Sequence, residues 1–445
     1  MLCGDRGLDN HHPTPTKGAA SSRNVIRITK EGKVRPVRRR ALASIPTVDD
    51  QASLVALIQA VIPLGLQAVA DVLNKEVTEL AGTRYSRTGG QSGYVRWCRQ
   101  RGSVYLLDQK LPVTYTRVRD RLRNVEVSLP TYQALGEPRA ADAGLFRKVL
   151  HGLSCRRYEA CAEAVPEAFG LSASSVSRRF VRASAGALQE LSERRLEGED
   201  IVGLVLDGKT FAADMIVIAL GITRQGEKQL LGFVQTATEN EAVCAEFLRG
   251  LVTRGLRTDQ GLLCVIDGAK GLRKAIQTVF GRQAVVQRCQ WHKRQNVVAY
   301  LPKSQQASWR RRLQQAYERP TYADARAALL ELRRELRLLN RSAAASLEEG
   351  LEETLTLHRL GVFSALGHSL KTTNCLESIN AQLGQLTDKV DRWRTSDQKH
   401  RWVASALLAI EPRLRRIKGY RHLPQLQAAL QRECQCEDVT TAHIA

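Results

Sequence analysis

Two aspartates stand directly after short apolar runs, in positions suited to metal chemistry. Asp207 follows the run in IVGLVLDGKTF, and Asp267 follows the run in GLLCVIDGAKG. Short runs of β-branched and other apolar residues bounded by Gly or charge predict buried strands. At the carboxyl ends of neighbouring strands, such side chains face the crevice in which an α/β sheet binds ligands. Because Mg²⁺ takes oxygen ligands, the two carboxylates predict a divalent-cation site.

A third carboxylate, Glu377, completes the predicted site. It lies in the first turn of a predicted helix for which Thr373 or Asn374 is a good N-cap. Three carboxylates can hold two metal ions about 3.5–4 Å apart, one activating water or a 3′-hydroxyl and the other stabilising the leaving oxygen of a phosphodiester. Asp207 would bridge both ions, while Asp267 and Glu377 would each hold one. The competing interpretation is that Asp207 and Asp267 only begin Asp-Gly turns.

The stretches around these carboxylates predict an α/β domain. The chain after Asp207 contains two more strand-like runs, then a helical stretch before the strand that leads to Asp267: MIVIALGIT, KQLLGFVQTAT and ENEAVCAEFLRGLVTRGL. After Asp267, a helix and a further strand entering a helix follow in GLRKAIQTVFG and AVVQRCQWHKRQNVVAYL. Residues 302–370 have a helical pattern and predict an all-helical insertion. The last segment is predicted to be helical and basic around Arg413, Arg415, Arg416 and Lys418.

Composition indicates a globular protein with a polyanionic partner. The chain has 445 residues, a formal net charge of +22 and 43% hydrophobic residues, enough for two or three domains with a sizeable core. The positive excess is spread along the chain and favours nucleic acid as a partner, with a merely soluble basic protein as the alternative. No apolar stretch is long enough for a membrane span. The ten scattered cysteines are expected to be reduced thiols in a cytosolic protein, and Cys434 and Cys436 are too weak a pattern to predict a metal site.

The N-terminal part divides by composition into three segments. Residues 1–46 carry a cluster of Arg and Lys and are predicted to be a flexible basic arm, either contacting DNA phosphates or forming a solvated tail. Residues 47–83 are apolar at helical spacing and predict two helices separated at Pro63. Residues 84–135 alternate apolar and polar side chains and predict a small, basic, antiparallel β-element, which either binds DNA or is structural.

Residues 136–198 predict a helix-turn-helix. A helix-like stretch ends at Phe169, Gly170 makes the turn, and Ser172 can cap a second helix, although Pro166 should kink the first. The second helix carries side chains that suit phosphate and base-edge contacts: Ser174, Ser175, Ser177, Arg178, Arg179 and Arg182. An ordinary helical hairpin is the alternative.

Four sequence blocks resemble the signature blocks of the Mutator-type transposases of bacterial insertion sequences, and they stand in the family's order: LDGKTF, DGAKGLRKAI, QRCQWHKRQN and TTNCLESIN. The resemblance runs from about Arg84 to the C-terminus and includes the helix-turn-helix block GLSASSVSR. The resemblance implies a ribonuclease-H-like core at 199–301, an all-helical insertion at 302–370, and completion of the core by 371–445 with basic C-terminal helices. It also implies a DDE triad at Asp207, Asp267 and Glu377 that uses Mg²⁺ or Mn²⁺, two ions per site, to nick and join DNA.

The family also carries a C-x-x-H block after the second Asp, matched here by Cys289 and His292. A zinc site needs four ligands and no second pair lies nearby in the sequence, so structural or DNA-end-positioning roles are favoured, with Trp291 as a stacking or packing residue. Three basic residues flank the block and are well placed for phosphates: Arg288, Lys293 and Arg294.

The predicted function is a DNA transposase. It would bind double-stranded DNA at the terminal inverted repeats of its element and at a target, and work as a homodimer or larger assembly in the bacterial cytoplasm, associated with the nucleoid. The alternatives are a metal-dependent nuclease of the same fold, and a domesticated regulator that uses only the helix-turn-helix. The sequence leaves open the repeat sequence and the choice between a cut-and-paste and a circle-forming route.

Overall fold

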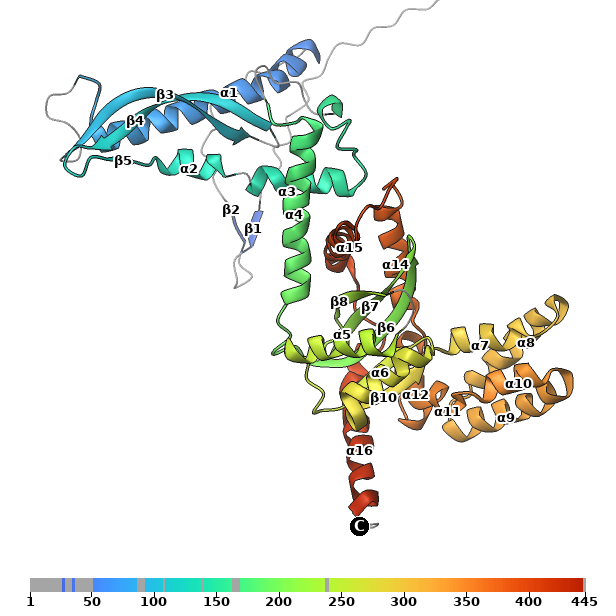
Figure 1. Ribbon diagram of the computed structural model, residues 1–445. Helices are drawn as coiled ribbons and strands as arrows, with labels where there is room; N and C mark the ends of the chain where they lie inside the picture. The colour runs from blue at the N-terminus through green and yellow to red at the C-terminus, as the bar shows by residue number, and fades with distance from the viewer. Residues whose placement is uncertain are drawn as a thin grey trace, which may run out of the picture. The chain divides into compact units, whose positions relative to one another are not determined.

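A computed structural model provides the three-dimensional structure (Figure 1). It describes residues 26–28, 34–36, 51–85, 93–106, 109–137, 139–161, 169–236 and 240–442. The chain divides into two compact units, Met1–Gly65 and Leu66–Ala445. In the described ranges, none of the helices combines the length and apolar character that a membrane span needs.

The N-terminal unit contains more regular structure than the predicted flexible arm. Strands β1 (Ile26–Ile28) and β2 (Val34–Pro36) pair antiparallel, the flexibility of the arm stays a prediction, and the rest of residues 1–46 lies outside the described residues. The two helices predicted for 47–83 are one helix, α1 (Gln51–Ala81). Pro63 removes only one backbone donor, and a long apolar helix can tolerate that loss.

A three-stranded antiparallel sheet forms the β-element predicted for 84–135. Its strands are β3 (Tyr94–Leu106), β4 (Gln109–Asp120) and β5 (Val125–Val127), in that order. The C-terminal part of α1 and the sheet bury one apolar cluster, which includes Val69, Leu73 and Val77 from α1 and Val104 and Val118 from the strands. The alternation of inward and outward residues in β4 therefore creates a sheet with one face covered by a helix.

Three helices connect this sheet to the central domain: α2 (Pro130–Gly136), α3 (Arg139–Leu150) and α4 (Ala173–Glu193). Helix α4 begins where predicted, because the Ser172 hydroxyl accepts a hydrogen bond from the Ser175 N–H at 3.4 Å. The prediction that a helix extends to Phe169 was wrong: Phe169 pairs antiparallel with Lys110 of β4. The Pro166 kink lies outside the described residues.

A mixed five-stranded sheet forms the centre of the α/β domain, with strand order β10-β9-β6-β7-β8 (Figure 1). The strands are β6 (Ile201–Phe211), β7 (Asp214–Thr223), β8 (Lys228–Thr236), β9 (Leu262–Ile266) and β10 (Ala284–Arg288). Strands β6, β7 and β8 are antiparallel, whereas β9 runs parallel to both β6 and β10. The predicted order of strands and helices in this region is confirmed.

Each face of this sheet buries a separate apolar cluster. Leu204 and Leu206 of β6 pack on the cluster shared with helices α5 (Glu241–Thr253) and α6 (Lys270–Phe280). Val205, on the opposite face, packs on a larger cluster that includes residues of helices α14 (Asn374–Thr387), α15 (Ser396–Ile410) and α16 (Leu423–Ala442). Because side chains alternate along a strand, Asp207 faces the same side as Val205.

Residues 302–370, predicted to be an all-helical insertion, form helices in the structure. After helix α7 (Gln290–Ala299), the chain forms six helices: α8 (Lys303–Tyr317), α9 (Tyr322–Leu339), α10 (Arg341–Glu348), α11 (Leu351–Thr354), α12 (Thr356–Arg359) and α13 (Phe363–Leu370). The residues from Val297 to Leu355 form a separate apolar cluster, whereas Leu357, Leu366 and Leu370 of α12 and α13 belong to the larger cluster of the central sheet.

The basic C-terminal segment is not one helix. Helix α15 ends at Ile410, α16 begins at Leu423, and short 3₁₀ turns and loop lie between them, which corrects the predicted helix around Arg413, Arg415, Arg416 and Lys418. Pro412 explains the break, because it cannot donate the backbone hydrogen bond that would continue α15.

Candidate active site at the ends of three parallel strands

Three polar residues form a row where the parallel pairing of β6, β9 and β10 ends. The parallel register pairs Leu206 with Ile266, and Ile266 with Arg288. The next residues in the three strands are therefore neighbours: Asp207, Asp267 and Cys289. The Cys289 N–H still donates to the Ile266 carbonyl at 2.7 Å, which fixes Cys289 beside Asp267. Residues far apart in sequence thus meet at one edge of the sheet.

The two aspartates lie in different kinds of local structure. Asp207 does not end its strand as predicted, because β6 continues to Phe211 while only its pairing with β9 stops at Leu206. Gly208 is paired with Val217 inside the sheet, so the turn interpretation fails for Asp207. It holds for Asp267, whose Oδ1 accepts a hydrogen bond from the Ala269 N–H at 3.0 Å. Asp207 is buried in a strand, and Asp267 lies in a turn.

Glu377 lies in the first turn of α14, as predicted, and β6 holds that helix. Lys209, two residues after Asp207 and on the same face of β6, donates from Nζ to the Asn380 carbonyl at 2.5 Å. Asn380 is three residues after Glu377, so both lie on one side of the helix. Lys209 therefore ties the helix that carries Glu377 to the strand that carries Asp207.

Cys289 and His292 form a polar pair beside the carboxylates. Burial opposes ionisation of the Cys289 thiol, but hydrogen bonds from His292 outweigh it and lower the pKa of Cys289. The hydrogen bond with Cys289, against the opposing effect of burial, raises the pKa of His292 to about 9, and the negative charges of Asp207 and Asp267 contribute. His292 Nε2 lies 4.0 Å from Glu377 Oε1. His292 is therefore within electrostatic reach of all three carboxylates.

The carboxylates are suitable donors for a hard cation, although they do not form a finished metal site. Glu377 Oε1 is buried and has no hydrogen-bond partner, so it can accept one more charged ligand. Within the described ranges, no group of three or more His, Cys, Asp or Glu side chains is already close enough to hold a metal ion. The donor chemistry fits Mg²⁺ or Mn²⁺, and binding would require the carboxylates to move closer together.

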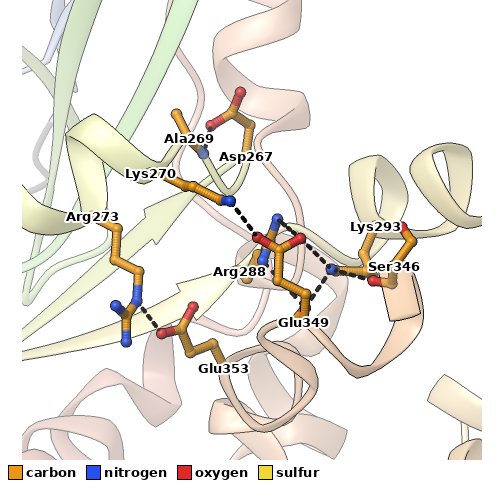
Figure 2. A network of polar contacts seen from close by, with 9 residues as sticks. All are labelled: Asp267, Ala269, Lys270, Arg273, Arg288, Lys293, Ser346, Glu349 and Glu353. Carbon is orange, nitrogen blue, oxygen red and sulfur yellow. Dashed lines mark hydrogen bonds and ion pairs between the residues drawn. The ribbon is translucent and has the colours of Figure 1, made fainter. Parts of the chain in front are cut away.

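The turn that contains Asp267 contacts the all-helical insertion through Glu349 (Figure 2). Lys270, at the start of α6, lies 3.7 Å from the Glu349 carboxylate. Arg288 donates to the Glu349 carbonyl at 3.3 Å, and its guanidinium also lies 3.7 Å from the carboxylate. Glu349 caps the end of α10, so the insertion is fastened to the loop that positions Asp267.

Two residues that flank the C-x-x-H block are buried instead of facing DNA. Lys293 is buried and donates to the carbonyls of Ser346, at 2.7 Å, and Glu349 (Figure 2). Burial, together with the charge of Arg288, lowers the pKa of Lys293 to about 8. Arg288 is also buried, so the prediction of phosphate contacts for these two residues is corrected. Both satisfy carbonyl oxygens at the end of α10, where the helix dipole favours cations.

Replacing Gly268 with Ala should destabilise the protein and displace Asp267. Gly268 has φ +112°, and an added Cβ would overlap Nε of Arg288. Since that backbone conformation is strained for any other residue and Arg288 is held by the insertion, a cost of roughly 1–3 kcal/mol is expected in thermal unfolding. Gly250→Ala is the matched control, because it lies inside α5 with no atom close to the new methyl group and should stabilise by about 0.5–1 kcal/mol. Equal effects of the two substitutions would contradict this account of the Asp267 turn.

The residues predicted to contact DNA on the second helix divide between surface and core. Ser174, Ser177, Arg178 and Arg182 are exposed, and Ser175 is half-buried. Arg179 is buried, with its guanidinium 5.7 Å from the centre of the Tyr105 ring, which corrects its predicted place on the outer face. Further along α4, the Phe180 ring contacts the Trp402 ring of α15 in a tilted arrangement, with 4.9 Å between ring centres.

Two residues of the site were missed at the sequence level. Thr373 is the N-cap of α14, but its side chain makes no cap; its hydroxyl contacts Cys289 Sγ at 3.8 Å and His292 Nδ1 at 3.5 Å. Lys209 stands two residues after Asp207, and period-two alternation could have placed it on the same face. No signal in the sequence indicates the contact of Thr373 with the C-x-x-H block.

Arg294 is half-buried and donates to Gln314 at 2.8 Å.

A comparison with protein families gives a match over most of the described domains. The family model described as "Transposase, Mutator family" matches residues 67–407. This range includes the three-stranded sheet, α4, the central sheet, the insertion and α14. It therefore contains every residue of the candidate site.

Curated relatives are named as transposases of insertion sequences. The chain is 30% identical over 258 residues to the transposase for insertion sequence element ISRM5 of Rhizobium meliloti (strain 1021), covering 56% of this chain and 63% of that protein. It is 28% identical over 250 residues to the transposase for IS6120 of Mycolicibacterium smegmatis, covering 55% and 75%. It is 28% identical over 285 residues to the transposase for IS406 of Burkholderia multivorans (strain ATCC 17616 / 249), covering 61% and 70%.

Proposed function

The chain belongs to the Mutator family of transposases, and from this premise we propose that it is a DNA transposase. It binds the terminal inverted repeats of its insertion sequence and catalyses metal-dependent strand cleavage and strand transfer. The observation that carries the proposal is the placement of Asp207 and Asp267 side by side where the parallel pairing of the strands ends, with Glu377 Oε1 4.0 Å from His292 Nε2. A ribonuclease-H-like core is part of the proposal, supported by three antiparallel strands joined in one sheet to two parallel ones.

Asp207, Asp267 and Glu377 would hold two Mg²⁺ or Mn²⁺ ions. When bound, such ions activate the attacking oxygen and stabilise the leaving oxygen of a phosphodiester. His292, positively charged through its contact with Cys289, orients the Glu377 carboxylate toward the sheet edge. Thr373 positions the imidazole from its other nitrogen, at 3.5 Å. The buried strand keeps Asp207 fixed, so the geometry depends mainly on the Asp267 turn and α14.

DNA contacts are assigned to the exposed start of α4 and to the basic surface. Ser174, Ser177, Arg178 and Arg182 present hydroxyl and guanidinium groups suited to phosphates and base edges, with Ser175 beside them and Arg294 near the candidate site. A helix-turn-helix that includes α4 remains part of this proposal. The net charge of +22 provides a general attraction for DNA. Because two element ends must be joined, we expect a homodimer or larger assembly on DNA.

The proposed place of action is the bacterial cytoplasm, on the nucleoid. Eight of the cysteines in the described part of the chain are free thiols, consistent with a reducing compartment. Cys434 donates to the Arg282 carbonyl at 3.2 Å, and this contact supports a structural role for it.

The test uses purified protein and a supercoiled plasmid that carries the element with its native flanks. Nicks should map to the two element ends in Mg²⁺ and disappear in EDTA. Metal-dependent nicks scattered over the plasmid would instead indicate a nuclease of the same fold. Tight binding to the ends without cleavage in any divalent metal would overturn the proposal and leave a DNA-binding regulator.

Lys209→Met should lower the rate of end cleavage about tenfold while leaving DNA affinity unchanged. The variant loses the hydrogen bond that ties α14 to β6, so Glu377 is held less firmly; a small misplacement of a catalytic group can cost this much. Lys209→Arg should restore part of the rate, because Arg can still donate to the Asn380 carbonyl. Lys303→Met, exposed at the start of α8, is the control. An equal loss of DNA affinity would show that Lys209 binds DNA instead.

A further inference from the structure

A small cavity opens beside the candidate active site. It has a volume of about 290 Å³ and lies between α7, α8 and the junction of α13 with α14. Its lining includes Trp291, Arg294, Lys371 and Asn374. Asn374 is three residues before Glu377, and Trp291 is next to His292, so the cavity adjoins the carboxylates. Small-molecule sites usually measure roughly 300–1,000 Å³, so this one has room for a single small ring system.

Trp291 is the feature of this cavity that points to a ligand. The residue is 38% exposed, although its neighbours Gln290 and Lys293 are buried. The indole ring lies 4.8 Å from the His292 ring in an edge-to-face arrangement, which fixes its orientation. Isolated exposed apolar residues are common on protein surfaces. A tryptophan that lines a cavity next to a polar site is different, because its flat face remains available for stacking.

The walls of the cavity are rigid and mainly cationic. The Gln290 N–H donates to the Lys371 carbonyl at 3.0 Å, which joins the start of α7 to the segment before α14. The Gln290 side chain donates to the Thr354 carbonyl at 2.9 Å. Two cations, Arg294 and Lys371, line the cavity with one carboxylate, Glu318, and Arg294 also donates to Gln314 at 2.8 Å. An aromatic face bordered by cations is suited to a flat, electron-rich ring attached to an anionic backbone.

We propose that this cavity receives one unstacked nucleobase of the DNA strand that is cut, with the base stacked on Trp291. The inference rests on the proposed transposase function and adds a substrate subsite to it. Arg294 and Lys371 are placed for the phosphates on either side of the base. Moving a base out of the duplex costs its pairing and stacking, and stacking on the indole offsets part of that cost. Any base can stack on an aromatic ring, so the subsite would fix the position of the DNA strand without selecting a base sequence.

The experiment probes the uncut strand of an end duplex with dimethyl sulfate, which methylates the Watson–Crick nitrogens of A and C only where the pairing partner has left the duplex. With the wild-type protein, one position around the cleavage site should become reactive on binding. Trp291→Ala should abolish that reactivity and slow cleavage roughly 5- to 150-fold, the range expected from the loss of one stacked base. Trp291→Phe should retain most of the base-displacement signal and most of the cleavage rate. Tyr300→Ala, an exposed aromatic residue at the end of the same helix, should change neither.

A second measurement separates stacking from a structural role. A duplex with a mismatch at the reactive position is already partly unstacked, so it should restore cleavage by Trp291→Ala but change the wild type little. Wild-type cleavage with no reactive position, or Trp291→Ala cleavage equal to wild type, would overturn the inference while leaving the transposase intact. An absence of wild-type cleavage at the ends would instead be a failure of the proposed function. Thermal unfolding of Trp291→Ala within a few degrees of wild type shows that the fold is retained.

Discussion

Glu377→Gln should reduce cleavage at the element ends by about a thousandfold or more. The substitution keeps the shape of the side chain but removes the charge that a divalent cation needs, and metal stabilisation of a phosphodiester transition state is worth several kcal/mol. Its Oε1 atom is buried without a hydrogen-bond partner and faces His292 at 4.0 Å. The measurement is the initial rate of nicking of an end-bearing plasmid in Mg²⁺. Asp207→Asn should reduce the rate of cleavage by a similar factor.

Binding and a matched substitution provide the controls for this loss. The affinity of Glu377→Gln for an end duplex should equal or slightly exceed that of the wild type, because the variant removes a negative charge close to DNA. Glu331→Gln makes the same chemical change on the exposed face of α9 and should nick at the wild-type rate. If Glu377→Gln nicks like Glu331→Gln, Glu377 is not part of the active site.

Glu411→Gln should destabilise the protein by about 3 kcal/mol. The Glu411 carboxylate accepts two hydrogen bonds from the Arg194 guanidinium, at 2.7 and 2.8 Å, and one from the Leu230 N–H at 2.7 Å. These contacts satisfy a backbone hydrogen-bonding group at the outer edge of β8. The hydrogen bonds with Glu411 are also the chief cause of the raised pKa of Arg194. Removing one partner of a mostly buried pair leaves the other charge uncompensated. Denaturant unfolding monitored by tryptophan fluorescence measures the change.

The exposed pair between Glu227 and Arg416 is the matched control. Both side chains are about half exposed, 51% and 52%, whereas those of Glu411 and Arg194 are 19% and 24% exposed. Water screens exposed ion pairs, so Glu227→Gln should cost no more than about 1 kcal/mol. A similar loss of unfolding free energy in both variants would mean that the ion pair between Glu411 and Arg194 does not stabilise the edge of the sheet.

The row of site residues was largely predictable because each follows an apolar strand. The runs before Asp207 and Asp267 indicated buried strands, and parallel pairing brings their ends together. The same logic applies to Cys289, which directly follows β10, although only the resemblance to a family suggested it. The all-helical insertion was also predictable, since its helical periodicity persists over many turns.

Burial of charged residues could not be predicted from the same patterns. Arg179, Arg288 and Lys293 belong to basic clusters that suggest a DNA-binding surface, yet all three are buried. Their long side chains satisfy carbonyl oxygens or pack on a ring, and those partners come from distant parts of the chain. Periodicity reports which face a residue occupies but not what covers that face. Positive charge alone therefore predicts too many DNA-binding residues.

Breaks in helices were the least predictable feature. Pro63 leaves α1 continuous, whereas Pro412 coincides with the end of α15. Proline removes one backbone donor in either case, and tertiary packing decides whether the helix continues. The residue after Asp207 shows the same limit, because Gly208 favours a turn by composition but is held in the strand by pairing with β7.

The most direct test of the central claim is strand joining by pre-cut ends. Duplexes that end in the 3′-hydroxyl of the element are mixed with the protein, Mg²⁺ and a supercoiled target plasmid, and covalent joint products are sequenced. The account predicts joints made through the 3′-hydroxyl by the wild type and by Glu331→Gln, and none by Glu377→Gln or in EDTA. Cleavage of end-bearing plasmids without any joints, under the same conditions, would contradict the claim and identify a nuclease.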